Sequence, residues 1–273
     1  MIDLHNHILY GLDDGARSLG DSFQMCRISH DDGIGSVVAT PHNVQGIYES
    51  DRSTILRKVE ELNEALQKFR ILGSDSLPVR QAGALRNPCL SGRHAHSAFK
   101  ILPGADVHFS LDLLQRFERG EIMTVNDQGR YLMVEFNSQG VPYQAEQVLF
   151  QLLSNGIIPI ISHPERNMEI GHNPQRYYQM IRMGCLGQVT AMSLTGGFGP
   201  KIKEIAEKLV SKKLIHMIAS DAHSTDRRPP ILSAAVKAAE KIVGREEARK
   251  MVTEYPEAVV EGHRPNLPEP IAI

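Results

Sequence analysis

The chain has 273 residues, with 30 lysines and arginines against 32 aspartates and glutamates. This near balance of charge argues against a nucleic-acid surface and against attachment to an anionic membrane. No run of about eighteen apolar residues occurs, so we expect no membrane insertion. The length suits one large α/β domain.

The N-terminus and the cysteines bear on where the protein resides. The chain begins with a predicted strand and shows no basic and apolar leader, so we expect no signal peptide. Cys26, Cys89 and Cys185 are an odd number of cysteines at unrelated spacings. This pattern fits a reducing cytoplasm better than a disulfide framework. We therefore expect a cytoplasmic protein, and the sequence leaves oligomerisation open.

Apolar runs and helical patterns alternate along the chain. The predicted strands are Ile2–Ile8, Ser36–Thr40, Lys100–Pro103, Tyr131–Phe136, Ile157–Ser162, Leu186–Ala191 and Leu214–Ser220. The predicted helices are Asp21–His30, Ser53–Phe69, Leu111–Arg119, Tyr143–Leu153, Pro174–Met183, Lys201–Val210, Ile231–Val243 and Glu246–Val252. Such alternation indicates a parallel sheet with helical crossovers. We expect a distorted (β/α)7 barrel in residues 1–262, with an open doubly wound sheet as the alternative.

Two segments depart from this rhythm. Residues 72–99 are rich in glycine, serine and proline and lack an amphipathic period. Connections of this length are usually functional or disordered, and we predict a mobile surface insertion in preference to an ordered lid. His94 and His96 lie within it without a surrounding strand pattern, so we expect solvated side chains. Residues 263–273 are rich in proline and are predicted to be an extended tail.

The first strand carries His5 and His7, two residues apart. Residues i and i+2 of a strand point to the same face, so both imidazoles can serve one divalent metal site. The last predicted strand ends in Asp221 and His223, which repeat the same spacing. The recurrence favours a metal site over chance placement of two histidines.

Further candidate ligands follow the other predicted strands. Asp13 and Asp14 lie between two glycines, where acids usually form a turn or a helix cap; alternatively one of them, preferably Asp14, turns inward onto a metal. His42 follows Thr40-Pro41 directly after a predicted strand, and His163 follows Ser162 in the same way.

Two carboxylates complete the pattern. Asp106 comes just beyond the strand that ends at Pro103, and Glu135 lies inside an apolar strand. A glutamate in such a strand is seldom buried without a partner, and a metal ion is one such partner.

Together these positions supply five histidines and four carboxylates. The candidate metal ligands are His5, His7, Asp14, His42, Asp106, Glu135, His163, Asp221 and His223. Nine ligands exceed the needs of one ion, so we expect two or three divalent ions, and the donor set of nitrogen and oxygen without thiolate suits Mn²⁺, Fe²⁺ or Zn²⁺. Such a positive site suits a phosphate ester and in-line displacement by an activated water.

Two arginines that follow candidate histidine ligands can bind the phosphate group of a substrate. Arg166 and Arg228 are the candidates for bidentate contacts to phosphate oxygens. A surface ion pair is the alternative for Arg166, and Arg227 can replace Arg228. We assign catalytic roles to both arginines together with Asp14 and His42.

These motifs resemble the PHP (polymerase and histidinol phosphatase) superfamily. The matching segments are His5-Asn6-His7, Asp13-Asp14-Gly15, Ala39-Thr40-Pro41-His42, Ile161-Ser162-His163-Pro164-Glu165-Arg166 and Ser220-Asp221-Ala222-His223. More narrowly, the chain resembles the manganese-dependent protein-tyrosine phosphatases of bacterial capsule and exopolysaccharide loci. The segments Leu194-Thr195-Gly196-Gly197-Phe198-Gly199 and Arg228-Pro229-Pro230 support the narrower resemblance.

The resemblance implies a trinuclear site in a distorted seven-stranded barrel. The first ion would be held by His5, His7, Asp106 and Asp221, the second by Asp106, Glu135 and His163, and the third by Asp14, His42 and His223. The implied substrate is phosphotyrosine on the C-terminal tail of a bacterial tyrosine kinase that governs polysaccharide export. This chain departs from the family at Asp106, where glutamate is usual, and in the insertion at 72–99.

Two other functions fit the same residues. A small-molecule phosphatase, such as histidinol-phosphate phosphatase, would use the same chemistry on a different ester. A non-catalytic PHP regulatory domain is the alternative from another class, although the full ligand set argues against it.

Overall fold

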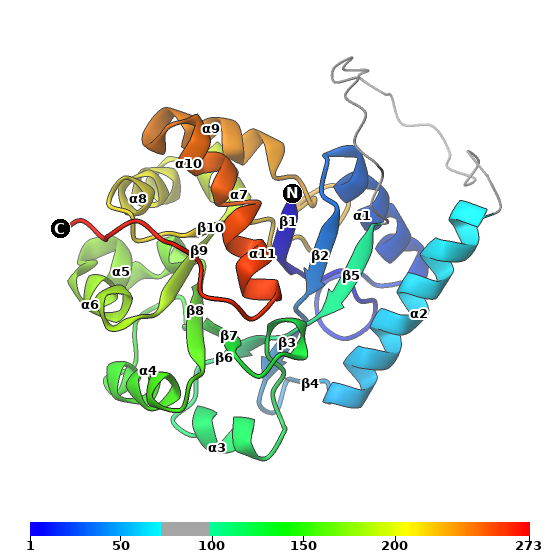
Figure 1. Cartoon of the computed structure of the whole chain (residues 1–273), viewed down its shortest axis with the longest axis horizontal. Coiled ribbons are helices and arrows are strands. Elements are labelled where there is room, and N and C mark those ends of the chain that lie inside the picture. Colours follow the sequence, from blue (N-terminus) through cyan, green and yellow to red (C-terminus); the bar gives the residue numbers. More distant parts are fainter. Residues whose placement is uncertain (72–98) are drawn as a thin grey trace.

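Helices surround a central group of strands in the computed structural model, which describes residues 1–71 and 99–273 (Figure 1). The strands are β1 (Ile2–Asn6), β2 (Ser36–Ala39), β3 (His42–Val44), β4 (Tyr48–Glu49), β5 (Lys100–Pro103), β6 (Asp106–His108), β7 (Tyr131–Glu135), β8 (Ile158–Ser162), β9 (Leu186–Thr190) and β10 (Met217–Ala219). The helices are α1 (Leu19–Asp31), α2 (Arg52–Ile71), α3 (Leu113–Glu118), α4 (Ala145–Ser154), α5 (Met168–His172), α6 (Gln175–Met183), α7 (Ala191–Thr195), α8 (Pro200–Ser211), α9 (Ser233–Val243), α10 (Arg245–Lys250) and α11 (Glu254–Val260), with 3₁₀ turns η1 (Val125–Asp127) and η2 (Pro164–Arg166).

Every strand and helix predicted from the sequence has a counterpart in the structure, whereas several short elements were not predicted. The unpredicted elements are β3, β4, β6, α5, α7 and α11. β3 and β6 have three residues each, and each begins shortly after a proline, Pro41 or Pro103. Three residues give too little alternation to reveal a strand, and proline is expected to end one.

Hydrogen bonding follows the order of the strands in the chain. One parallel sheet has the order β1-β2-β5, and the other has the order β10-β9-β8-β7-β6-β3-β4, in which only β3 and β4 are antiparallel. The chain runs directly from β2 into β3 and from β5 into β6. These two stretches of chain therefore join the two sheets. At the other side, the Asp221 N–H donates to the His5 carbonyl (2.8 Å) and the His7 N–H donates to the Ala222 carbonyl (2.9 Å).

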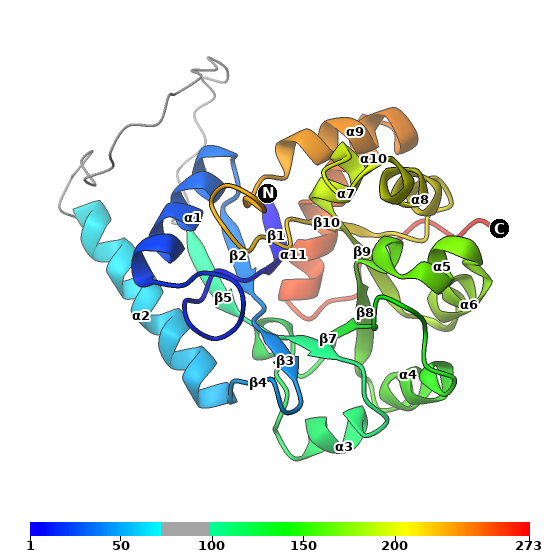
Figure 2. The same ribbon diagram turned by 180° about the vertical axis from the view of Figure 1, so that it is seen from behind.

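One apolar core joins the strands to the surrounding helices, so the fold is a single α/β domain. Alternating or fully apolar strands such as β7 and β8 bury Leu132, Val134 and Ile161 completely. Figure 2 shows the face on which the loop after β1 lies, and Figure 1 shows the opposite face, with α11 and the C-terminal segment. Within the described ranges, no helix is both long enough and apolar enough to cross a membrane.

The two irregular segments of the sequence have different outcomes. The predicted insertion at 72–99 lies outside the described residues except for Phe99. Residues 263–273 contain neither helix nor strand. This segment is fixed at both ends, because the Tyr131 hydroxyl donates to the His263 carbonyl (2.6 Å) and the Ile271 N–H donates to the Lys212 carbonyl (2.9 Å).

The packing around β9 gives a first testable prediction. A Cβ at Gly187 would lie 2.0 Å from the Tyr177 hydroxyl oxygen and 2.5 Å from the Leu214 carbonyl oxygen, and Tyr177 is fully buried. We expect Gly187→Ala to lower the free energy of unfolding by about 1–3 kcal/mol, because a packed core resists added volume. Urea denaturation measures this change.

Gly20→Ala is the matched control. Gly20 lies in α1, and a Cβ there would meet only the Ser18 hydroxyl oxygen at 3.5 Å. Alanine is the better helix former by about 1 kcal/mol, so this variant should equal or exceed the parent in stability. Equal urea midpoints for the two variants would contradict the close packing at Gly187.

Candidate metal centre

His5, in β1, and His7, just beyond the end of that strand, form one side of a buried cluster. β1 is held between β2 and residues 221–222, so its backbone has little freedom. The two Nε2 atoms of His5 and His7 lie 3.1 Å apart, and both side chains are buried. Burial lowers the pKa of His5 to about 4, so its ring is neutral near pH 7 and can act as a ligand.

The ends of the other strands bring carboxylates to these rings. Asp106, the first residue of β6, places Oδ2 3.4 Å from His5 Nε2, 3.7 Å from His42 Nδ1 and 3.9 Å from His163 Nε2. Asp221, just beyond β10, places Oδ1 3.4 Å from His5 Nε2 and 3.5 Å from His7 Nε2. These two carboxylates therefore lie between histidines that are far apart in the sequence.

The remaining residues extend the cluster toward solvent. Glu135, at the end of β7, places Oε1 3.4 Å from His163 Nε2 and Oε2 3.6 Å from His42 Nδ1. Asp14 Oδ1 lies 3.4 Å from His223 Nε2 and 3.6 Å from His42 Nε2. The Asp14 side chain is 55% exposed, so it marks the open edge of the cluster.

All nine residues predicted as metal ligands lie in four overlapping groups of potential ligand atoms. The groups are His7, Asp14, His42 and His223; His5, Asp106 and His163; His5, His7 and Asp221; and His42, Asp106 and Glu135. Within each group the ligand atoms lie within 4.8 Å of one another. The individual pairs of ligand atoms described above lie 3.1–3.9 Å apart. These distances are compatible with shared cations, because two donors that each lie about 2.1 Å from an ion are at most about 4.2 Å apart.

Unpartnered polar atoms support this fit. His42 Nδ1, Asp106 Oδ2 and His223 Nε2 are buried and form no hydrogen bond with any residue of ranges 1–71 and 99–273. Burying such atoms without a partner costs free energy, and a bound divalent ion would remove that cost. Nitrogen and carboxylate donors without thiolate are typical of Mn²⁺, Fe²⁺ or Zn²⁺ sites.

The electrostatics of the carboxylates also suit cations. Burial alone would raise the pKa of Asp221, but its neighbours His5, His7 and Arg228 outweigh burial and hold the pKa well below its usual range. For Glu135, burial is likewise outweighed, chiefly by His108 and His163, and the pKa is lowered. Both carboxylates are therefore ionised at neutral pH.

Some residues that shape the cluster were not assigned a role from the sequence. Asp13 Oδ2 lies 2.6 Å from His7 Nδ1 and accepts the His42 N–H at 2.9 Å. Gln188 Oε1 lies 3.0 Å from His5 Nδ1, and the Ser162 hydroxyl donates to Asp106 Oδ1 at 2.7 Å. Partners of this kind fix the tautomer and orientation of a ligating histidine. Gln188 is a polar residue inside a predicted apolar strand, which is the pattern that identified Glu135. The same pattern could have identified Gln188 from the sequence.

Arg166 and Arg228 converge on one oxygen of Asp221. Arg166 Nη1 and Arg228 Nη2 each lie 2.5 Å from Asp221 Oδ2. Arg166 is therefore part of the cluster and does not form the surface ion pair considered as its alternative. Arg227 is exposed and forms no ion pair with a described carboxylate. The Phe198 ring centroid lies 5.2 Å from the Arg166 guanidinium carbon and 5.9 Å from that of Arg228.

Two cavities adjoin the cluster. One of about 500 Å³ extends from Asp14 and His223 to Arg17, Arg227 and Arg228. A small one of about 40 Å³ lies beside Glu135, His163 and Arg166. The larger cavity gives a ligand access to the exposed edge of the metal centre.

Comparisons with known proteins show what this chain is similar to. The family model "Capsular polysaccharide synthesis, CpsB/CapC" matches residues 1–72 and 83–261. The tyrosine-protein phosphatase YwqE of Bacillus subtilis is 33% identical over 246 residues, which cover 90% of this chain and 86% of YwqE. The tyrosine-protein phosphatase CpsB of Streptococcus pneumoniae is 28% identical over 265 residues, covering 95% of this chain and 98% of CpsB.

A solved structure is also similar to this chain. It comes from a study of YwqE and CpsB, described there as unique metal-dependent tyrosine phosphatases. Its TM-score with this chain is 0.87 at 32% sequence identity, and the match covers 100% of this chain and 99% of the other.

The contact between Asp13 and His7 can be tested by metal binding. We expect Asp13→Asn to weaken Mn²⁺ binding about 10- to 100-fold, because the amide orients the His7 ring less firmly. Isothermal titration of chelator-stripped protein measures the affinity. Asp31→Asn is the control, since Asp31 is an exposed aspartate on α1 that lies 3.9 Å from Arg27. Equal Mn²⁺ affinity in both variants would contradict a role for Asp13 at the metal centre.

Proposed function

Because the chain belongs to the CpsB/CapC family of capsular polysaccharide synthesis, we propose that it is a metal-dependent tyrosine-protein phosphatase. The main structural support for this proposal is that Arg166 and Arg228 both contact Asp221. The same carboxylate also faces His5 and His7. A site where bound metal cations and guanidinium groups meet would favour the binding of a dianionic phosphoester. The names of the relatives YwqE and CpsB support the same activity.

We propose that the nine ligand candidates hold two or three divalent ions, with Mn²⁺ preferred and Fe²⁺ or Zn²⁺ as alternatives. In the three-ion arrangement the sets are His5, His7, Asp106 and Asp221; Asp106, Glu135 and His163; and Asp14, His42 and His223. Asp106 is shared by two sets, in keeping with the position of its Oδ2 among three imidazoles. Bound divalent ions supply Lewis-acid stabilisation and lower the pKa of water for attack on phosphorus.

The arginines position the phosphate. Each guanidinium carries five N–H donors, so Arg166 and Arg228 can retain Asp221 and still donate to phosphate oxygens. Asp221 in turn fixes both arginines beside the histidines, so the phosphate is oriented before reaction. Asp14 and His42, at the open edge of the cluster, are our candidates for contact with the reacting phosphate.

Phe198 favours an aromatic ester. Its half-buried ring lies beside both guanidinium groups and offers an apolar face to the ring of a phosphotyrosine. The cavity of about 500 Å³ beside His223 and Arg228 leaves room for the flanking peptide. These features favour a phosphotyrosine protein over a small ester such as histidinol phosphate. From the family resemblance, we propose the C-terminal tail of a capsule-regulating bacterial tyrosine kinase as the substrate.

We further infer that the strands form one distorted seven-stranded barrel. The pairing of the strands within the two sheets supports this arrangement. The hydrogen bonds from the Asp221 N–H to His5 and from the His7 N–H to Ala222 also support it, because they join the segment after β10 to β1. Among the described strands the order contains no reversal, which a doubly wound sheet would require. The free thiols of Cys26 and Cys185 are compatible with a reducing compartment, and we place the protein in the cytoplasm.

Hydrolysis of a phosphotyrosine peptide tests the proposed function. We expect chelator-stripped protein to be inactive, Mn²⁺ to restore turnover, and Asp221→Ala to abolish it because both histidines and both arginines lose a shared partner. Phosphate release from the peptide is compared with release from histidinol phosphate. A preference for histidinol phosphate would assign the small-molecule activity instead, and no turnover of either ester by metal-loaded, folded protein would favour a regulatory domain.

The phosphate-binding arginines can be tested separately. We expect Arg228→Gln to lower kcat/KM for the peptide by about 100-fold, since a charged contact at the reacting group contributes about 1.5–3 kcal/mol. Arg245→Gln is the control, because Arg245 is exposed and does not line the cavity beside the metal centre. An equal loss in the two variants would mean that Arg228 acts only through the general charge of the surface.

A further inference from the structure

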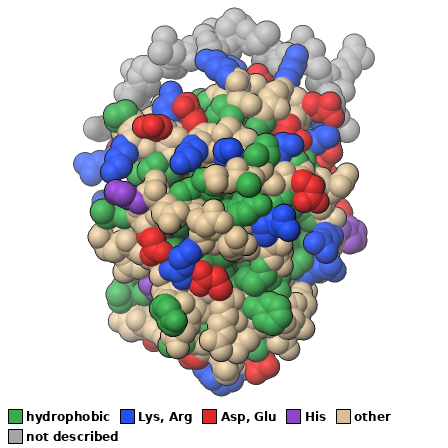
Figure 3. Space-filling model, turned by 90° about the vertical axis from the view of Figure 1, so that its left-hand side faces the viewer, with side chains coloured by type: hydrophobic (Ala, Val, Ile, Leu, Met, Phe, Trp, Pro, Cys, Tyr) green, Lys and Arg blue, Asp and Glu red, His purple; other side chains and the backbone are tan. Residues whose placement is uncertain are grey.

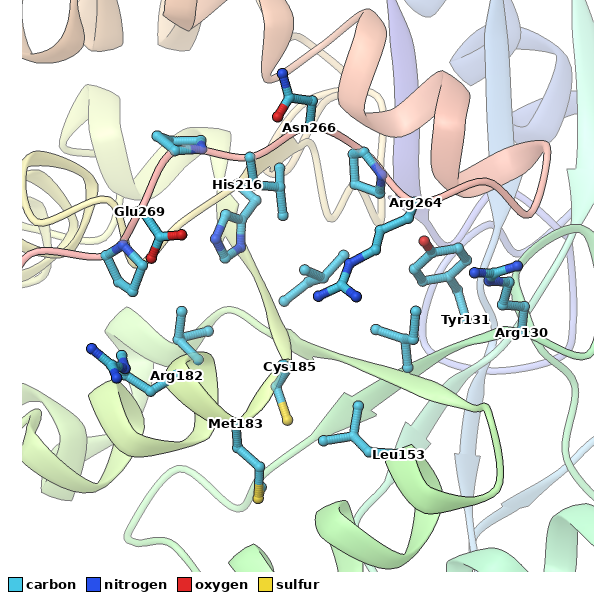
Figure 4. A pocket seen from close by; sticks show the side chains of 18 of the residues that line it. Arg130, Tyr131, Leu153, Arg182, Met183, Cys185, His216, Arg264, Asn266 and Glu269 are labelled. Atoms are coloured by element: carbon cyan, nitrogen blue, oxygen red, sulfur yellow. The ribbon is translucent and has the colours of Figure 1, made fainter.

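A second large cavity lies at the end of the strands opposite the metal centre. It has a volume of about 920 Å³, and Tyr131, Ile158, Leu186 and His216 line it at or just before the first residues of β7, β8, β9 and β10. Its other side is formed by residues 264–270, which we call the C-terminal strap (Figure 4). Known small-molecule pockets have volumes of about 300–1,000 Å³.

The C-terminal strap is held in place at both ends. On one side the Tyr131 hydroxyl holds the His263 carbonyl, and on the other the Lys212 carbonyl accepts the Ile271 N–H. Pro265, Pro268 and Pro270 restrict the backbone between these points. Leu267 also packs against the apolar core, so the strap forms a fixed wall of the cavity.

Basic groups dominate the charge of this cavity. Arg130, Arg182 and Arg264 line it together with a single carboxylate, Glu269, and in Figure 4 the Arg264 side chain extends from the strap into the cavity. No described carboxylate forms an ion pair with any of the three arginines. Burial lowers the pKa of His216 to about 4, so this ring adds no charge near pH 7.

The excess of basic groups in this cavity differs from the chain as a whole, which has 30 lysines and arginines against 32 aspartates and glutamates. Figure 3 shows one side of the molecule, where basic and acidic side chains are interspersed with hydrophobic ones. Apolar side chains also lie in the cavity, among them Leu153, Ile158 and Ile181. The cavity therefore combines unpaired guanidinium groups with an apolar wall.

We propose that this cavity binds a small organic anion. A carboxylate or phosphate group would pair with the guanidinium of Arg264, whose planar donors match either group, and the apolar body would lie against Leu153 and Ile158. Arg130 and Arg182 add to the positive potential at the rim. The site is independent of the proposed phosphatase activity.

The two sites are separated by the length of a strand. β7 begins at Tyr131, which lines the cavity, and ends at Glu135, which belongs to the metal centre. Four residue steps at about 3.3 Å span roughly 13 Å. A small anion in the cavity therefore does not reach the metal ligands.

Isothermal titration with naphthalene-1-sulfonate tests the proposal, since this probe has an apolar body and an anionic group that a phosphatase cannot hydrolyse. We expect saturable binding of one equivalent, weakened about tenfold or more in Arg264→Gln because a charged hydrogen-bonded contact is lost. Arg182→Gln should weaken binding to a smaller extent. Arg245→Gln, which removes an exposed arginine outside the cavity, should bind as the parent does.

Control measurements on variants and on a neutral probe show at which site the probe binds. Binding that persists in Arg264→Gln but is lost in Arg228→Gln would place the anion at the metal centre and overturn the proposal. Equal affinity for the neutral naphthalene-1-methanol would show that the cavity does not select an anion. Absence of saturable binding to the folded parent protein would also overturn it. Circular dichroism of each variant verifies that Arg264, which is exposed, is not needed for folding.

Discussion

The junction between β1 and the end of β10 positions the metal centre. Asp3, buried in β1, accepts the Ser220 N–H (2.9 Å), the Ser220 hydroxyl (2.5 Å) and the Asn6 side-chain N–H (3.0 Å). These bonds fix the register of the two segments, so that Asp221 follows at the level of His5 and His7. Since a displacement of one residue would turn alternate side chains to the other face, this register decides whether the cluster exists.

Local patterns predict much of the site. The spacing of His5 and His7, repeated at Asp221 and His223, indicates a shared site from the period of a strand, and the gathering of ligands on one face follows from parallel strands. In the structure His7, Asp221 and His223 lie just beyond the ends of β1 and β10, so the strand period alone does not account for their positions. Asp3 and Asp13 could not be assigned in this way. Their partners Ser220 and His42 are far along the chain, and no local pattern tells which side chains will meet.

Backbone conformation at the ligands was also beyond prediction. His163 has φ of 34° and Asp221 has φ of 50°, in the left-handed region that residues with a side chain seldom adopt. The Asp221 N–H is held by the His5 carbonyl, and the His163 carbonyl accepts the Arg166 N–H. A long-range contact at Asp221 and the local 3₁₀ turn after His163 thus accompany a strained conformation at two candidate ligands, as is common at functional sites. His and Asp adopt positive φ more often than most residues with a side chain, but residue type alone does not tell which of the histidines and aspartates does so.

Asp106 shows how the fold can accommodate a shorter carboxylate than the family resemblance leads one to expect. A Cβ at Gly104 would lie 2.8 Å from Val38 Cγ1, so glycine lets the chain between β5 and β6 pass close to β2. Asp106 then pairs in register with His42 on β3 and Met133 on β7. Because Ser162 holds one oxygen at 2.7 Å, the other is directed at three imidazoles. An aspartate at this position therefore reaches three imidazoles of the cluster.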